Sequence, residues 1–231
     1  MHFSHHPDLW QQYPELVAGV LFARGIRHDA DASAPTAAYE ALARARLEQA
    51  GSESELPEIQ AWRRTFSRMG LKPTQYRCAS ESLLRRLRKE GTMPRIHPLV
   101  DACNAISMAF AIPVAVIDAA QVRGPLQVRP ALGSERYLGF GGEAEHPEPG
   151  EVTFADAEGN AHARRWTHRQ SGLSAVRDGT SEVLVVAEAM HATAAEDVPR
   201  LLDAIAQMLR EVWGIEAARA VLGAGSPEFR A

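Results

Sequence analysis

The segment from Pro94 to Asp118 constrains the fold most, because it predicts a helix that runs directly into a buried strand. Pro98 falls in the first turn, where a missing N–H is tolerated, and Pro113 ends the helix. Asp101 and Asn104 are three residues apart and share a stripe beside the apolar face. That apolar face is formed by Val100, Cys103, Ile106, Ser107 and Phe110.

The remaining pattern divides into a helical first half and a strand-rich second half. Apolar runs and turn residues predict further helices over 35–49, 57–69, from an N-cap at Ser80 to 90, and over 194–213. Strands are predicted over 16–23, 114–118, 125–129, 137–138, 151–155, 161–166 and 182–187. We therefore expect a single compact α/β domain over 1–231, with a central mixed sheet packed by helices and a flexible tail over 223–231.

Composition is that of an ordinary globular protein. The 231 residues are 45% hydrophobic and 23% charged, with a formal net charge of −4. No apolar run is long enough to span a bilayer, and the first residues do not resemble a secretory signal. Two cysteines cannot form a disulfide framework, so a reducing cytoplasm is the expected location and no membrane partner is expected.

The charge is unevenly distributed. Ten basic residues crowd the stretch from 63 to 95: Arg63, Arg64, Arg68, Lys72, Arg77, Arg85, Arg86, Arg88, Lys89 and Arg95. They are compatible with a face that contacts phosphates, and equally with a pair of solvated amphipathic helices.

Several familiar motifs are absent or out of context. His2, His5 and His6 have no Cys or carboxylate at ligand spacing, so we expect no metal site and no cofactor. The glycine-rich run 139–142 leads into a proline-rich loop rather than a helix, which predicts a turn instead of a phosphate loop. No G-x-S-x-G elbow marks Ser107, Ser171 or Ser174 as a nucleophile, and Cys103 is read as a core residue.

The run 164–180 combines arginines, a tryptophan and a histidine between two strands. Trp166, His168 and Arg169 would form a pocket rim that offers a stacking surface and donors for a carboxylate or phosphate. An exposed strand with alternating side chains would give the same pattern without a ligand.

Together these residues resemble the B3/B4 editing domain of the phenylalanyl-tRNA synthetase β subunit. The resemblance runs from about 65 to 190 and includes the helix 82–91. It rests on Pro94, Ile96, Val100, Asp101, Asn104, Pro113 and Asp118, and later on Gly172, Ser174, Val176, Thr180, Val183 and Leu184.

The resemblance implies a free-standing domain that binds the acceptor end of tRNA and not DNA. In the synthetase this domain hydrolyses the ester between a wrong amino acid and the terminal adenosine, using a positioned water and donors for the oxyanion. For this chain we assign the catalytic roles to Asp101, Asn104, His168 and Arg169, and place Lys72, Tyr76, Arg85, Arg86 and Trp166 near the substrate. Asp101 and Asn104 have an alternative structural role in capping the helix or fixing the strand below it.

Two positions depart from the family pattern. Ala115 stands where the synthetase has a histidine linked to editing, and Gly172 stands where an acidic residue is expected. The synthetase's selectivity for tyrosine is therefore not transferred to this chain.

Three hypotheses follow from the sequence. The first is an aminoacyl-tRNA deacylase that acts in trans, and the second is a non-catalytic module of the same fold that binds RNA or an amino-acid-like ligand. The third is a small-molecule hydrolase that uses the same pocket. The sequence leaves open the amino acid, the tRNA, the oligomeric state and the role of residues 1–60.

Overall fold

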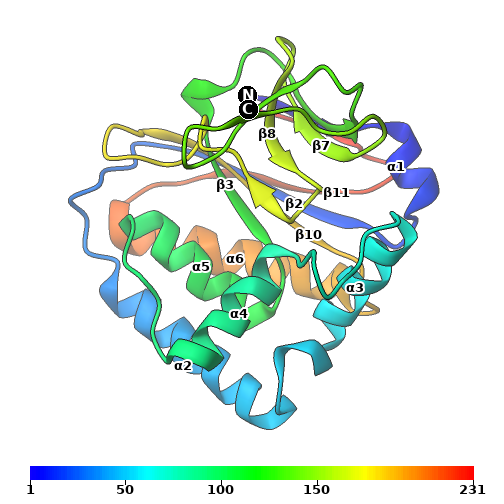
Figure 1. Cartoon of the computed structure of the whole chain (residues 1–231). Coiled ribbons are helices and arrows are strands. Elements are labelled where there is room, and N and C mark those ends of the chain that lie inside the picture. The colour runs from blue at the N-terminus through cyan, green and yellow to red at the C-terminus, as the bar shows by residue number, and fades with distance from the viewer.

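The computed structural model describes all 231 residues and shows two β-sheets with helices around them (Figure 1). The smaller sheet has four strands in the order β11-β2-β10-β3, and every neighbouring pair is antiparallel. Its strands are β2 (Val17–Arg24), β3 (Val114–Asp118), β10 (Glu182–Ala189) and β11 (Ala218–Leu222). The long central strands β2 and β10 are apolar over most of their length, as expected for strands buried on both faces.

Alternate residues of the smaller sheet supply two separate cores, because successive side chains of a strand point to opposite faces. Val183 and Val185 of β10 pack on one face with Leu99 of α5 and Leu201 of α6. Leu184 and Val186 face the other way, into a second core that the larger sheet shares. The smaller sheet is therefore the central layer of the molecule.

The larger sheet is mixed and has eight strands. Its order is β12-β1-β4-β7-β8-β5-β6, and β9 pairs with β8. The parallel pairs are β1 with β4 and β5 with β8. The bounds are β1 (His2–His5), β4 (Leu126–Pro130), β5 (Arg136–Leu138), β6 (Ala144–Glu145), β7 (Val152–Ala155), β8 (Asn160–Arg164), β9 (Arg169–Gln170) and β12 (Glu228–Arg230).

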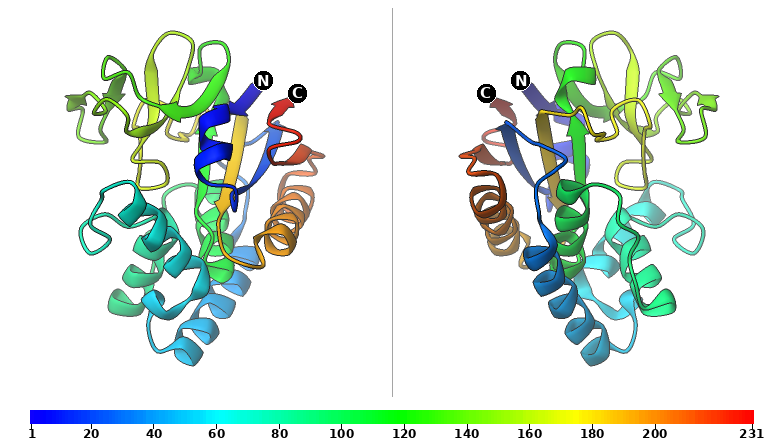
Figure 2. Two further views of the ribbon diagram at one scale, coloured as in Figure 1. Left: turned by 90° about the vertical axis from the view of Figure 1, so that its right-hand side faces the viewer. Right: turned by 90° about the vertical axis from the view of Figure 1, so that its left-hand side faces the viewer.

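Helices cover the two faces of the central layer. Figure 2 shows α6 on one side of the strands and α3 and α4 on the other, which agrees with their membership of different cores. None of the helices combines the length and apolarity needed to cross a bilayer. The bounds are α1 (Pro7–Gln12), α2 (Ser33–Ala50), α3 (Pro57–Arg68), α4 (Ala79–Glu90), α5 (Pro98–Phe110) and α6 (Ala194–Trp213), with 3-10 turns at Glu53–Glu55 and Ala119–Gln121.

The expected α/β domain, helix-rich first and strand-rich later, is confirmed, with a second sheet in addition to the one predicted. Part of the stretch 223–231, which was predicted to be a flexible tail, is paired with another strand. Residues 228–230 form β12, which pairs with β1, and Phe229 is only 6% exposed because it packs in the core shared by the two sheets. The two ends of the chain consequently lie side by side (Figure 1).

Two local expectations also change. Ser80 is not the N-cap of α4: Cys78 occupies that position, and the Ser80 hydroxyl donates to the carbonyl oxygen of Ala111 at 3.0 Å. Strand β8 ends at Arg164, so Trp166 lies in the turn that follows rather than in the strand. The glycine-rich run 139–142 forms the predicted turn, here between β5 and β6.

Candidate functional site

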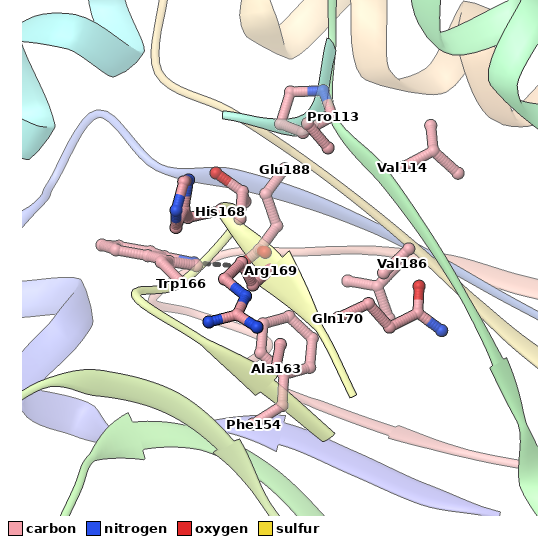
Figure 3. Close-up of a pocket in the computed structure, with 13 residues that line it drawn as sticks. Pro113, Val114, Phe154, Ala163, Trp166, His168, Arg169, Gln170, Val186 and Glu188 are labelled. Atoms are coloured by element: carbon pink, nitrogen blue, oxygen red, sulfur yellow. Dashed lines mark hydrogen bonds between the residues drawn. The ribbon is translucent and has the colours of Figure 1, made fainter. Parts of the chain in front are cut away.

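A pocket lies where the two sheets and the start of α4 meet (Figure 3). The space between its walls is about 400 Å³ when the open solvent at its mouth is included. Its apolar wall comes from β3, β7, β8 and β10, and its polar groups come from the turn after β8, from β9 and from β10. The apolar wall includes Pro113, Val114, Ala115, Phe154, Ala163 and Val186, and the polar groups include His168, Arg169, Gln170 and Glu188.

The turn between β8 and β9 has a backbone conformation that side-chain-bearing residues rarely adopt. Arg165 and Trp166 have φ angles of 48° and 60°, in the left-handed region. Their amides are held by Glu151 Oε1 at 2.9 Å and by the carbonyl oxygen of Val152 at 2.7 Å, respectively. Strained turns of this kind persist where surrounding bonds fix them, and they occur often at functional sites. Here the turn aims His168 and Arg169 at the pocket.

His168 has the bonding of an oriented base. Its Nδ1 lies 2.7 Å from the carbonyl oxygen of Arg77, which only accepts, so Nδ1 carries the proton. Burial lowers the pKa of His168 below its usual value; the bond to Arg77 opposes this, and the charges of Arg165 and Arg169 lower the pKa further. The imidazole is therefore neutral near pH 7, and Nε2 keeps a lone pair that no protein donor occupies. A water in the pocket could give its proton to this nitrogen.

Arg169 also lines this side of the pocket, and Tyr76 packs behind it against His168. The Arg169 guanidinium lies 3.3 Å from Glu145 and 3.4 Å from Glu143, in partly exposed ion pairs. Ion pairs of that kind are weak, so the guanidinium remains available to a ligand. The Tyr76 ring meets the His168 ring edge-on at 5.3 Å between centroids, and the Arg165 guanidinium lies 4.9 Å from the centre of the Tyr76 ring.

Glu188 is the site residue that the sequence analysis missed. It lies in β10 and is only 2% exposed, yet it lines the pocket. Its Oε1 accepts hydrogen bonds from His5 Nε2 at 2.6 Å and from Trp166 Nε1 at 2.8 Å, the latter drawn in Figure 3. The available signal was a single acidic residue near the end of an unbroken aliphatic strand. Its partner His5 belongs to the N-terminal histidine cluster, which the sequence analysis considered only as a metal site.

The structure brings some of the predicted site residues together and separates others. Trp166, His168 and Arg169 line the pocket, and Tyr76 contacts the ring of His168 without lining the pocket. Trp166 was expected to offer a stacking surface at the rim of the pocket. Instead it is 1% exposed and forms part of the inner wall, where it packs edge-on against Trp62 and Tyr13.

Asp101 and Asn104 lie on α5 and do not line the pocket. Asp101 accepts a hydrogen bond from the backbone amide of Ile96 at 2.9 Å, which fits the structural role considered for it. Cys103 on the same helix is buried, and burial raises the pKa of its thiol to about 12, so it is no nucleophile at neutral pH.

The predicted tRNA-binding residues outside the turn are all near the surface. Arg85 pairs with Glu53 at 3.4 Å, and Arg86 pairs with Glu90 at 2.9 Å. Lys72 is exposed and forms no ion pair; it lies in the loop that also carries Tyr76. Their roles remain predictions.

A second group of side chains has the composition of a hydrolytic triad. His162 Nδ1 lies 2.8 Å from Ser174 Oγ, and His162 Nε2 lies 3.2 Å from Asp156 Oδ2. His162 and Ser174 are both 0% exposed, and neither lines the pocket. Without a space beside the hydroxyl for a substrate, this group serves to fix the loop that follows β7.

One cluster has the side chains of a metal site. Ligand atoms of Glu58, His191 and Asp197 all lie within 4.8 Å of one another. Each residue already has protein partners: Arg46 binds Glu58 at 2.8 Å, and His191 Nε2 lies 3.0 Å from Asp197 Oδ2. The cluster is separate from the pocket and does not contribute to its chemistry.

Comparison with known families assigns the fold. The family model described as "B3/4 domain" matches residues 61–212, which includes the whole turn and pocket-bearing strands β3, β7, β8 and β10. The chain belongs to the B3/4 domain family. The match agrees with the family that the sequence motifs indicated, and extends beyond the stretch 65–190 at both ends.

Among solved structures, this B3/4 domain protein is similar to an N-terminal fragment of the phenylalanyl-tRNA synthetase β-subunit from Pyrococcus horikoshii. The TM-score is 0.49 with 11% identity, and the match covers 93% of this chain. It covers 49% of the other chain, so this B3/4 chain spans about half of the fragment. A search of curated proteins finds no match.

The structure explains one departure of this B3/4 chain from the synthetase pattern. A Cβ added at Gly172 would lie 3.0 Å from the carbonyl oxygen of Gly139, closer than most real contacts. The turn between β5 and β6 therefore occupies the space in which an acidic side chain at 172 would begin. Ala115, the other departure, lines the pocket and makes this part of its wall apolar.

Proposed function

We propose that the chain binds the acceptor end of tRNA and hydrolyses the aminoacyl ester of a mischarged tRNA in trans. Membership of the B3/4 family and the resemblance to the synthetase editing domain support the substrate class. The observation that carries the chemistry is His168: a neutral imidazole fixed through Nδ1, with Nε2 free, in a mostly apolar pocket.

In the proposed reaction His168 accepts one proton from water and later returns it to the leaving ribose oxygen. Water attacks the ester carbonyl carbon while His168 Nε2 takes its proton, and a tetrahedral oxyanion forms. Arg169 donates to that oxyanion. The bond from the carbonyl carbon to the ribose oxygen then breaks, and the imidazolium returns the proton to this oxygen. The products are the free amino acid and the uncharged tRNA, so atoms and charge balance without a further reactant.

The RNA backbone is proposed to cross the surface beside the pocket. A shallow hollow formed by Arg63, Arg64, Ser67, Arg68, Pro73 and Thr74 lies at the end of α3 and the loop after it. Arg64 and Lys72 are exposed there and have no acidic partner, unlike Arg85 and Arg86. The double variant Arg64→Ala, Lys72→Ala should weaken the salt dependence of tRNA binding. The slope of log K for tRNA binding against log[salt] should become shallower by about 1 to 2. The matched control is Arg200→Ala on α6, an exposed arginine paired with Asp197 that no prediction places near the RNA.

The alternative is a binding module without turnover. Ala115 favours it, because this residue replaces the family's histidine inside the pocket itself. The test is release of labelled amino acid from a panel of correctly and wrongly charged tRNAs by the purified chain. Turnover of one mischarged species above the spontaneous rate supports the deacylase. Binding of tRNA with no turnover across the panel would contradict hydrolysis and support the module.

A further inference from the structure

Glu188 is a buried carboxylate with one oxygen uncommitted. Oε1 accepts both available hydrogen bonds, from His5 and from Trp166, and Oε2 accepts none from the protein. Glu188 also lines the pocket, so Oε2 is the carboxylate oxygen that remains for a ligand there.

No arginine or lysine pairs with this carboxylate. The indole of Trp166 is neutral, and the only ion-pair partner within reach is His5. The other ring nitrogen of His5, Nδ1, is enclosed and has no hydrogen-bond partner. Arg169, the nearest cationic side chain lining the pocket, pairs instead with Glu143 and Glu145.

We propose that Glu188 binds the α-ammonium group of an amino-acid ligand, whose apolar side chain lies against the apolar wall of the pocket. A buried carboxylate without an arginine or lysine partner is costly, and an ammonium group that enters the pocket offsets this cost through a charge-assisted hydrogen bond. A hard metal ion is a poorer occupant, because it needs about six oxygen ligands and the pocket offers one acidic residue.

The wall defines the class of side chain. Val114, Ala115, Phe154, Ala163 and Val186 present only carbon atoms of their side chains. Gln170, the polar residue next to β3, is committed through Nε2 to the carbonyl oxygen of Val116 at 2.7 Å. An aliphatic or unsubstituted aromatic amino acid therefore fits better than one with a polar side chain. The assignment of an ester substrate rests on the proposed function, whereas the ammonium site is independent of it.

The test compares amino-acid amides with their N-acetyl derivatives, because amides resemble the ester without its lability. Leucinamide, phenylalaninamide and alaninamide are titrated into the full chain by calorimetry. We expect N-acetylation to weaken binding by about tenfold to a hundredfold. Equal affinity of free and acetylated amides would overturn the proposal, as would the absence of binding by all three amides at millimolar concentration.

Two variants separate the charge from the fold. Glu188→Gln keeps an oxygen that accepts from His5 and Trp166 and removes the charge, so it should reduce affinity for the free amide to that of the acetylated one. Ala115→Leu fills the pocket from a half-buried wall position without touching the carboxylate, and should weaken the binding of both ligands equally.

The control is Glu58→Gln. Glu58 is a buried carboxylate that has Arg46 as its cation and lies outside the pocket, so this variant should preserve the preference for the free amine. Unchanged selectivity in Glu188→Gln would contradict the proposal, and Ala115→Leu provides the test of location should Glu188→Gln not fold.

The two proposals fail in different ways. Equal rates of hydrolysis of an aminoacyl-tRNA and its N-acetyl form would contradict the ammonium site and would leave the proposed deacylase activity standing. Amide binding that depends on Glu188, without hydrolysis of any charged tRNA, would remove the deacylase and leave the site.

Discussion

His162 and His168 are six residues apart and have opposite surroundings. His162 has the serine and aspartate of a hydrolytic triad, and is 0% exposed with both ring nitrogens bonded inside the protein. His168 has no such partners, and only one of its nitrogens is engaged. Burial lowers the pKa of both, although the Asp156 carboxylate opposes the shift at His162.

The difference shows that access and a free lone pair decide function more than the residue types present. The His162 group is saturated with bonds and has no adjacent space, so it can only hold structure. In His168, by contrast, Nε2 has no hydrogen-bond partner in the protein. A substrate water fits at this nitrogen. The following predictions test this contrast.

The largest effect is expected for His168→Asn. The asparagine amide nitrogen stands near the position of Nδ1 and can keep the bond to Arg77, but no base remains. We expect deacylation to fall by about 10² to 10⁴-fold with little change in melting temperature. Single-turnover rates and thermal melts measure the two quantities; full activity in this variant would remove His168 from the reaction.

Asp156→Ala should affect stability strongly. Asp156 is 5% exposed and accepts from the amides of Arg123, Glu158 and Asn160, as well as from His162. Burial works to raise its pKa, but these bonds prevail and hold the pKa below its ordinary value. Losing the acceptor should cost about 3 to 5 kcal/mol in the free energy of unfolding. Denaturant melts check this, and a loss below about 1 kcal/mol would show that the network is not structural.

Turnover should depend on pH only on the acid side of the pKa of His168. The active form is deprotonated, and burial lowers its pKa below 6.5. The enzyme-dependent rate should therefore fall about tenfold per pH unit below that pKa and level off above it. His162 makes the folded state less stable on acidification, because its folded pKa is also below that of the unfolded chain. Circular dichroism at each pH therefore separates loss of fold from loss of base.

The smallest effect is expected for Ser174→Ala. The hydroxyl is a hydrogen-bond donor to His162, and its loss should cost about 1 to 2 kcal/mol of stability. Deacylation should be unchanged because Ser174 is remote from the pocket lining. A loss of turnover comparable to that of His168→Asn would reverse the assignment of roles to the two histidines.

The local elements were predictable because their signals are local. Helix α6 and the helix–strand pair α5–β3 follow from apolar periodicity and from Pro98 and Pro113. The turn that carries His168 and Arg169 was also recognised, from its density of donors and aromatic residues. Its strained backbone was not, since neither Arg165 nor Trp166 is a residue type that signals a left-handed conformation.

The contacts that complete the pocket were not predictable, because they join distant parts of the chain. His5 and Glu188 are 183 positions apart and meet only because β1 joins the larger sheet beside β4, on the shared core. The tail was predicted to be flexible because its glycine and polar residues gave no strand signal, and its order comes from pairing with β1. Topology, rather than any local pattern, determines both.

The close approach at Gly172 makes two regions of the sequence interdependent. An acidic residue at 172 and the present turn at 139–142 compete for the same space, since a Cβ at 172 would already crowd Gly139 and Phe140. Introducing the acid alone should therefore be deleterious, whereas the same change should be tolerated after the turn is shortened. The residue at 172 and the turn at 139–142 are thus coupled through a single backbone contact, so the effect of a substitution at one position depends on the other.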